Sequence, residues 1–333
     1  MDHVILFVSL VMAVAPMVAM LYFIWWVDRY DREPLRFVLA AFLWGGFGAI
    51  GLSIIASTFS ISLFQEAIYT AYDAGFDAGT IVVAPVVEEF MKGLIVFFLL
   101  RYRNFDNVTD GLVYGAASGL GFGMTENFLY FTQYAGYDPG YEWLSLIFIR
   151  SMLTANMHCA ASATFGAGIS KLKEHGVKAV MYVLGSYLLA VLLHGTWNYL
   201  VTTGSAEGWE TAVLLLIVYV VIIFIIFVFG IRGERKQRET VLGEEFDLGV
   251  LPKEFKKTLM SYRSMKKSGW FPEYLNKSKF LMLVSRLSLR KTSYYKSSGK
   301  RREKLHTEIV EVRKELKEFS ALVTQVSNDD KNT

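Results

Sequence analysis

The sequence contains a single cysteine and few charged residues in its first two-thirds. Cys159 alone cannot form an intrachain disulfide, and it provides no cysteine spacing of the kind that binds zinc. The N-terminus also lacks the basic region of a signal peptide, and its apolar run over residues 4–27 is longer than a signal-peptide core. We therefore expect this run to be a retained membrane helix.

Apolar residues dominate the chain instead. Hydrophobic residues make up 53% and aromatic residues 15% of the 333 positions, which is too apolar for an ordinary soluble domain. The sequence therefore predicts an all-α fold, a polytopic membrane helical bundle of about seven transmembrane helices of about 20 residues each. These runs begin near Val4, Phe37, Thr80, Gly111, Trp143, Lys178 and Trp209.

The segments that connect these runs alternate in charge along the chain. Cytoplasmic loops of membrane proteins are enriched in lysine and arginine, so we expect the N-terminus outside and the C-terminus in the cytoplasm. The basic segments carry Arg29, Arg32, Arg36, Arg101, Arg103, Lys171, Lys173 and Lys178, and a further basic cluster spans 232–238. The charged residues of segments 60–79, 135–142 and 204–210 are all acidic, namely Glu66, Asp73, Asp77, Asp138, Glu142, Glu207 and Glu210.

Residues 232–333 contain no spanning run and are densely charged, so we expect a cytoplasmic, basic helical tail after a transmembrane domain at 1–231. An a/d heptad pattern near 305–326 predicts a helix with one apolar face. That face either packs within the tail or forms a coiled coil with a second copy or another protein. Its residues are Leu305, Ile309, Val312, Leu316, Phe319, Val323 and Val326, and the candidate partners within the tail are Leu281, Leu283, Val284 and Leu287. We expect no nucleic-acid partner.

Several polar residues interrupt the apolar runs, where a charged side chain costs about 2.5 to 3.5 kcal/mol on insertion scales. Glu88, Glu126 and His194 each lie eight residues from the outer end of their run, which is about 12 Å deep at helical rise. His158 reaches the same depth if Arg150 marks the outer boundary of its run. The full set is Glu88, Glu89, Lys92, Glu126, Asn127, His158, His194 and Asn198.

Carboxylates and imidazoles at one depth suit hydrolysis, because they can hold a divalent metal or orient water while another carboxylate acts as general base. Lys92 follows Glu88 by one helical turn and can neutralise an acid in low dielectric. Asn198 follows His194 by one turn, where it could orient the histidine or donate to an oxyanion. A structural ion-pair network is the alternative. Cys159 should point away from the direction of His158, so we expect a small apolar filler rather than a nucleophile.

Glycines recur every fourth residue along the fourth run. Gly111, Gly115, Gly119 and Gly123 form a small-residue stripe, which lets another helix approach closely. Ser162 and Gly166 continue the same kind of surface beyond His158. We expect these stripes to place the polar groups inside the bundle, away from lipid.

The order of motifs resembles that of the PrsW family of intramembrane proteases, which is related to the CAAX-processing and bacteriocin-immunity proteases. The matching pieces are Glu-Glu-Phe-Met-Lys at 88–92, Gly-Phe-Gly-Met-Thr-Glu-Asn at 121–127, His158 with the small residues after it, and His-Gly-Thr-Trp-Asn at 194–198. The resemblance implies a bacterial or archaeal cell-membrane protease. Its expected substrate is a membrane-anchored protein, such as an anti-sigma factor, cut near the outer face in stress signalling.

Site roles follow from the same resemblance. Glu88 would be the catalytic base, with Glu89 beside it, and Asn198 would stabilise the oxyanion. Glu126, His158 and His194 would bind a metal or water. The resemblance is compatible with a divalent metal such as zinc and with a metal-free glutamate mechanism.

Two other functions fit a helical bundle with buried polar residues. A seven-span zinc-dependent lipid amidase would use a richer set of histidines, and its products would be lipids rather than peptides. A cation or proton-coupled transporter could use Glu88, Lys92 and Glu126 as a relay. Transporters usually contain internal repeats, and we find no repeat between the halves of this sequence.

Overall fold

The structure is a computed structural model of the 333-residue chain. It describes residues 3–28, 33–73, 75–102, 105, 107–135, 140–261, 264–265, 267–273, 275–295, 297 and 299–329, without the side chains of 174, 234 and 323–329. Arg29, Arg32, Arg103 and Asp138, and the side chains of Val323 and Val326, therefore lie outside the described residues. All regular elements in the described ranges are helical, so the predicted all-α fold is confirmed.

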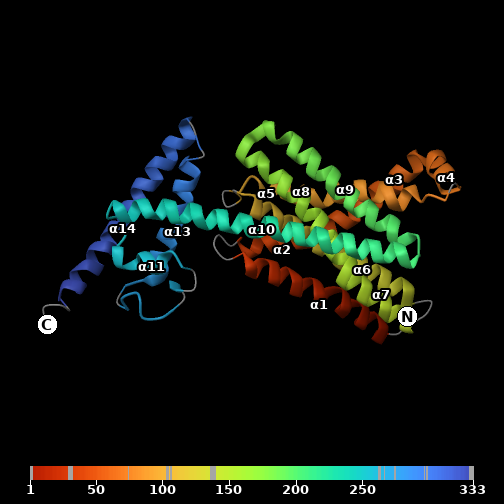
Figure 1. The fold of residues 1–333 in the computed structure, drawn as a ribbon, viewed down its shortest axis with the longest axis horizontal. Coiled ribbons are helices and arrows are strands. Elements are labelled where there is room, and N and C mark those ends of the chain that lie inside the picture. Colours follow the sequence, from red (N-terminus) through yellow and green to blue (C-terminus); the bar gives the residue numbers. More distant parts are fainter. Residues whose placement is uncertain are drawn as a thin grey trace. The chain divides into compact units, whose positions relative to one another are not determined.

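The chain divides into two compact units, at 1–230 and 231–333. Figure 1 shows their helices in sequence colours. The first unit holds α1 (His3–Val27), α2 (Leu35–Leu43), η1 (Trp44–Ala49), α3 (Ile50–Leu63), α4 (Gln65–Asp73), η2 (Gly79–Val83), α5 (Ala84–Leu99), α6 (Val108–Ala135), α7 (Tyr141–Ile149), η3 (Arg150–Thr154), α8 (Ala155–His175), η4 (Gly176–Ala179) and α9 (Val180–Thr202). Helix α10 (Ala206–Asp247) begins in the first unit and ends in the second, which also holds η5 (Lys253–Phe255), α11 (Lys256–Leu259), α13 (Lys277–Tyr295) and α14 (Gly299–Asp329).

Four of the described helices are long and apolar enough to cross a membrane by length and composition. They span His3–Val27, Leu35–Leu63, Gly176–Thr202 and Ala206–Asp247. Helices α5, α6 and α8 are not among them, although each coincides with an expected spanning run. Helix α5 carries three charged residues, Glu88, Glu89 and Lys92. Helix α6 packs against α1, α2, α5 and α8, so its surface does not need the apolar composition of a lipid-facing helix.

The close packing of α6 explains its glycines. A Cβ atom on Gly115 would lie 2.2 Å from the carbonyl oxygen of Ser162, and one on Gly111 would lie 2.3 Å from that of Gly166. Both partners are on α8, so the predicted small-residue stripe is confirmed as the α6–α8 contact. On another face of α6, a Cβ on Gly121 would lie 1.9 Å from the carbonyl oxygen of Phe42 on α2. Helix α6 is therefore held at backbone contact from two sides.

The second unit has its own apolar core. The heptad residues Leu305, Ile309, Val312 and Leu316 are each at most 5% exposed. All but Leu305 belong to a buried cluster that includes Leu283, Val284 and Leu287 of α13, and Phe319 packs against this cluster. The apolar face of α14 is thus used inside the tail.

A buried ion network accompanies that core. Glu245, at the end of α10, accepts hydrogen bonds from Lys291 at 2.6 Å and from the guanidinium of Arg313 at 2.6 and 2.8 Å. Burial by itself raises the pKa of Glu245, but the hydrogen bonds from Arg313 and Lys291 outweigh it and leave the pKa below its ordinary value.

Candidate active site

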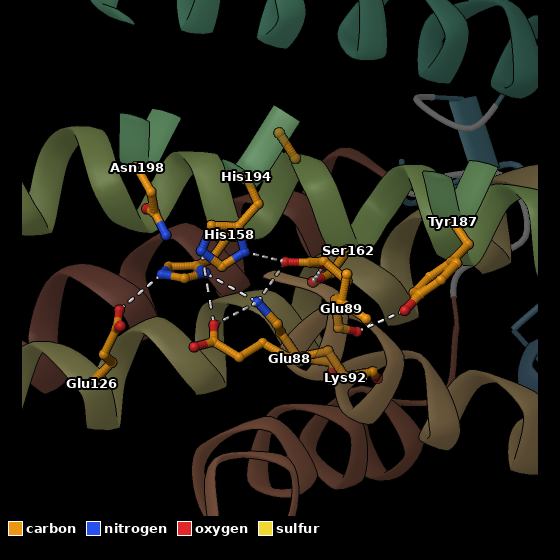
Figure 2. A network of polar contacts seen from close by, with 12 residues as sticks. Glu88, Glu89, Lys92, Glu126, His158, Ser162, Tyr187, His194 and Asn198 are labelled. Carbon is orange, nitrogen blue, oxygen red and sulfur yellow. Dashed lines mark hydrogen bonds and ion pairs between the residues drawn. The ribbon is translucent and has the colours of Figure 1, made fainter. Parts of the chain in front are cut away.

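The polar residues predicted from the sequence converge between four helices of the first unit. Glu88, Glu89 and Lys92 come from α5, Glu126 from α6, His158 from α8, and His194 and Asn198 from α9 (Figure 2). The rings of His158 and His194 lie edge to face, with their centroids 4.8 Å apart. Glu89, Lys92, His158 and His194 are all buried.

Single π-helical turns lead into two of these helices. Turn η2 precedes α5, and turn η3 precedes α8. A π-helical turn shifts the direction in which the following side chains point, and such turns are frequent at functional sites. Local backbone geometry therefore contributes to the inward direction of Glu88 and His158.

Glu89 is fully engaged as an acceptor. Its Oε1 atom lies 2.6 Å from Lys92 Nζ and 2.9 Å from His194 Nδ1, and its Oε2 atom accepts a hydrogen bond from Ser162 Oγ at 3.0 Å. A carboxylate accepts hydrogen bonds, so Nδ1 of His194 carries the proton and Nε2 carries a lone pair. Glu89 thereby fixes both the orientation and the tautomer of His194.

His158 is oriented in a similar way by a different carboxylate. Its Nε2 atom lies 2.8 Å from Glu126 Oε2, which makes Nε2 the donor. The lone pair of His158 is then on Nδ1, which lies 3.1 Å from Lys92 Nζ. Each histidine is therefore held by one carboxylate through one ring nitrogen. The other nitrogen of His158 faces the Lys92 ammonium, and that of His194 faces Glu88 Oε2 at 3.8 Å.

Glu88 differs from the other two carboxylates. Its buried Oε2 atom has no hydrogen-bond partner among the described residues, and it lies 3.7 Å from Lys92 Nζ and 3.8 Å from His194 Nε2. A buried acceptor without a partner is costly, which marks this position as a place for a water, a proton or a cation. Ligand atoms of Glu88, His158 and His194 lie within 4.8 Å of one another. Two imidazoles and one carboxylate are a donor set that zinc takes in catalytic sites with an open position, so the residues present fit a divalent metal.

Lys92 compensates the negative charge at the centre of the site. Its ammonium group is completely buried, donates to Glu89, and lies 4.3 Å from the centroid of the Phe122 ring. A buried lysine is retained at such low exposure only when its charge is paired. The predicted pairing of Lys92 with an acid is confirmed, and its shortest contact is with Glu89 rather than with Glu88.

Asn198 lies at the edge of the site (Figure 2). Its Nδ2 atom donates a hydrogen bond of 2.9 Å to the carbonyl oxygen of Thr80 in η2. This hydrogen bond joins α9 to the segment in front of α5. The second N–H group of the Asn198 amide is not used by this hydrogen bond.

Sequence reasoning missed Arg150 as part of the site and placed it only at the membrane boundary. The structure has its NH2 group 2.6 Å from Glu126 Oε2. Ser162 and Thr80 were also missed. Arg150 could have been assigned to the site because it is a charged residue within an apolar run. Nothing in the sequence distinguishes Ser162 and Thr80 from other small polar residues. Cys159 faces an apolar cavity lined by residues of α1, α6, α8 and α10, as expected of a filler.

A buried pair of oriented histidines thus lies beside a buried acceptor without a hydrogen-bond partner among the described residues, and such groups can hold a metal ion or orient water. The family model described as PrsW family intramembrane metalloprotease matches residues 33–229. The chain therefore belongs to the PrsW family of intramembrane metalloproteases. This membership decides against the lipid amidase and the transporter.

Curated relatives agree with the family match. Protease PrsW of Geobacillus kaustophilus is 30% identical over 208 residues, covering 62% of this chain and 85% of the relative. Protease PrsW of Clostridioides difficile is 30% identical over 211 residues, covering 62% and 83%. Protease PrsW of Bacillus subtilis is 26% identical over 212 residues, covering 62% and 87%. No solved structure matches the chain.

Proposed function

We propose that this protease hydrolyses a peptide bond of a membrane-anchored protein near the outer membrane face, at the site formed by Glu88, His158 and His194. The observation that carries the proposal is the buried Glu88 Oε2 atom without a hydrogen-bond partner, next to the lone-pair nitrogen of an oriented histidine. An anti-sigma factor is the substrate class that the family resemblance suggests.

The contacts favour a division of roles in which the metal is held by Glu88, His158 and His194, with Glu126 as an orienting residue. Glu126 Oε2 is already engaged by Arg150 and His158, whereas Glu88 Oε2 accepts no hydrogen bond among the described residues. When bound, a divalent ion such as zinc would polarise water and the substrate carbonyl.

The chain's own residues supply the remaining chemistry. In the metal-free alternative, the same buried oxygen of Glu88 takes the proton of the attacking water. Glu89 and Glu126 hold His194 and His158 in fixed orientations. Lys92 compensates the charge of Glu89 through an ion pair of 2.6 Å. The second N–H of Asn198 is the candidate donor to the oxyanion.

For the topology we propose seven spans, with the N-terminus outside, the protease domain at 1–231 and a cytoplasmic tail at 232–333. Helices α5, α6 and α8 complete the seven, shielded from lipid by their neighbours. Labelling of cysteines introduced at Asp77 and Lys236 with a membrane-impermeant reagent tests the orientation. Labelling of only the Lys236 position from outside would overturn it. Association through the tail coiled coil stays a prediction, tested by whether removal of 305–326 changes the mass of the solubilised particle.

The site assignment is tested with purified protein in proteoliposomes and a single-span substrate. We expect Glu88→Gln and His194→Ala to insert and fold but to lose cleavage, and a chelator to abolish cleavage by the wild type. His175→Ala is a matched control, because His175 is an exposed histidine at the end of α8. Wild-type rates in Glu88→Gln and His194→Ala would refute the site. Full activity after complete metal removal would refute the metal alone.

A further inference from the structure

Arg150 forms a cluster of contacts at the wall of the site that the proposed chemistry leaves unexplained. Its guanidinium donates from NH2 to Glu126 Oε2 at 2.6 Å and from Nε to Asn127 Oδ1 at 3.1 Å. The face of the guanidinium lies 3.7 Å from the centroid of the Tyr130 ring. Three residues of one face of α6 thus hold one side chain from η3.

The contact between Arg150 and Asn127 is reciprocal. Asn127 receives a hydrogen bond from the Arg150 side chain and donates its own, from Nδ2, to the Arg150 carbonyl oxygen at 3.3 Å. Arg150 is also the first residue of the π-helical turn, where the carbonyl oxygen accepts the backbone N–H of Ala155. Both ends of the residue are therefore fixed, and a fixed guanidinium presents its donors in one plane.

The fixed guanidinium shares an acceptor with a histidine of the site. Glu126 Oε2 lies 2.6 Å from Arg150 NH2 and 2.8 Å from His158 Nε2. His158 is 1% exposed, whereas the side chain of Glu126 is 20% exposed. Without the arginine, this more exposed carboxylate would have other rotamers available, and its position opposite His158 would no longer be determined.

We propose that Arg150 is a positioning residue, which holds the Glu126 carboxylate opposite His158 Nε2 and thereby fixes the orientation of the imidazole, whose Nδ1 faces Lys92 Nζ at 3.1 Å. The inference rests on the proposed function, because it assigns His158 to the reaction centre. If Arg150 served only to compensate the charge of Glu126, any cationic side chain at position 150 would be sufficient.

Arginine and lysine variants separate the two roles. Arg150→Met removes charge and geometry, whereas Arg150→Lys keeps the charge but loses the planar pair of donors. We expect kcat to fall about 10- to 100-fold in Arg150→Met, with KM unchanged. We expect Arg150→Lys to be more stable to unfolding than Arg150→Met, because the charge is kept, but to have the same lowered kcat. Lys173→Met is the matched control, because Lys173 on α8 also ties helices together, through the carbonyl oxygens of Leu100 and Tyr102, far along the helix from the site.

The Nε2 signal of His158, the ring nitrogen that contacts Glu126, provides a readout that does not depend on activity. The readout is imidazole ¹⁵N NMR of the metal-free full chain, labelled at its five histidines. The His158 signals are identified by their absence in His158→Ala. We expect the same His158 signals in the wild type and in Lys173→Met, and a shifted Nε2 signal in both Arg150 variants, because the Glu126 acceptor at 2.8 Å is displaced. This readout distinguishes failure of the inference from failure of the proposed function, because it is obtained whether or not the chain cleaves the substrate.

A double-mutant cycle tests whether Arg150 acts through Glu126. If it does, Glu126→Gln with Arg150→Met should lower kcat no further than the stronger single variant. Additive losses would overturn the proposal. It would also be overturned by full kcat and wild-type His158 signals in Arg150→Lys, which would leave charge as the only role. A raised KM with unchanged kcat would overturn it as well, because that result would indicate substrate contact.

Discussion

Replacement of Glu89 by glutamine should destabilise the protein more than any ordinary surface substitution. Glu89 and Lys92 are both fully buried, and the ammonium group lies 2.6 Å from the carboxylate. Glutamine has nearly the shape of glutamate, so the substitution leaves no cavity. It removes the negative charge that compensates Lys92 and one acceptor of the hydrogen bond from His194.

The size of the expected loss in stability depends on how far the charge of Lys92 remains compensated in Glu89→Gln. Breaking a buried ion pair by removing one partner costs about 3 to 5 kcal/mol, and a lysine inside a membrane costs about 2.5 to 3.5 kcal/mol on insertion scales. Glu88 lies 3.7 Å from the ammonium and compensates part of the loss. We therefore expect a free energy of unfolding lower by about 3 kcal/mol.

Unfolding by denaturing detergent in mixed micelles measures this loss. Glu239→Gln is the control, because its ion pair with Arg235 is exposed, and such pairs contribute about 1 kcal/mol or less. In the double variant Glu89→Gln with Lys92→Met, most of the loss should be recovered, since no unpaired charge remains. Equal small losses in Glu89→Gln and Glu239→Gln, or no recovery in the double variant, would refute the reasoning.

Two further predictions concern packing and the tail. Gly115→Leu should prevent folding or lower the folded yield on size-exclusion chromatography several-fold, because its Cβ would lie 2.2 Å from the Ser162 carbonyl oxygen. Gly185→Leu is the control and should behave as wild type, because the space around Gly185 is open. Similar yields for the two variants would contradict the α6–α8 contact. The pKa of Glu245 lies below its ordinary value of 4.5, so its stabilisation of the tail is complete above that pH and is lost as the pH falls below it. The protection factors of α13 amides, which are the exchange rates of the unfolded chain divided by those of the protein at the same pH, should therefore fall on acidification in the wild type and change less in Glu245→Gln. An identical pH dependence of the protection factors in the two would contradict the ion network.

The residues of the site could be predicted because charge and imidazole are rare inside apolar runs. Glu88, Glu126 and His194 stand out as polar residues within apolar runs and share one predicted depth, and the structure brings them together around His158 (Figure 2). The glycine repeat of α6 was also informative, because only a small residue permits contact at the backbone distance seen for Gly115.

The pairing of these residues could not be predicted, because it depends on the rotation of each helix. The π-helical turn η3 was not predicted from the sequence, and it begins at Arg150, whose guanidinium contacts Glu126. Helical spacing placed Lys92 one turn after Glu88, whereas its shortest contact is with Glu89. The heptad pattern of α14 left two partners open, and only the three-dimensional fold places Ile309 and Val312 in a core within the tail.

The central claim is hydrolysis at Glu88 inside the membrane domain. Its most direct test is mass spectrometry of the product termini when a single-span substrate is incubated with the protease in proteoliposomes. We expect the wild type to produce one new terminus near the outer end of the substrate's span, and Glu88→Gln to produce none. The same terminus at a similar rate from Glu88→Gln would contradict the account.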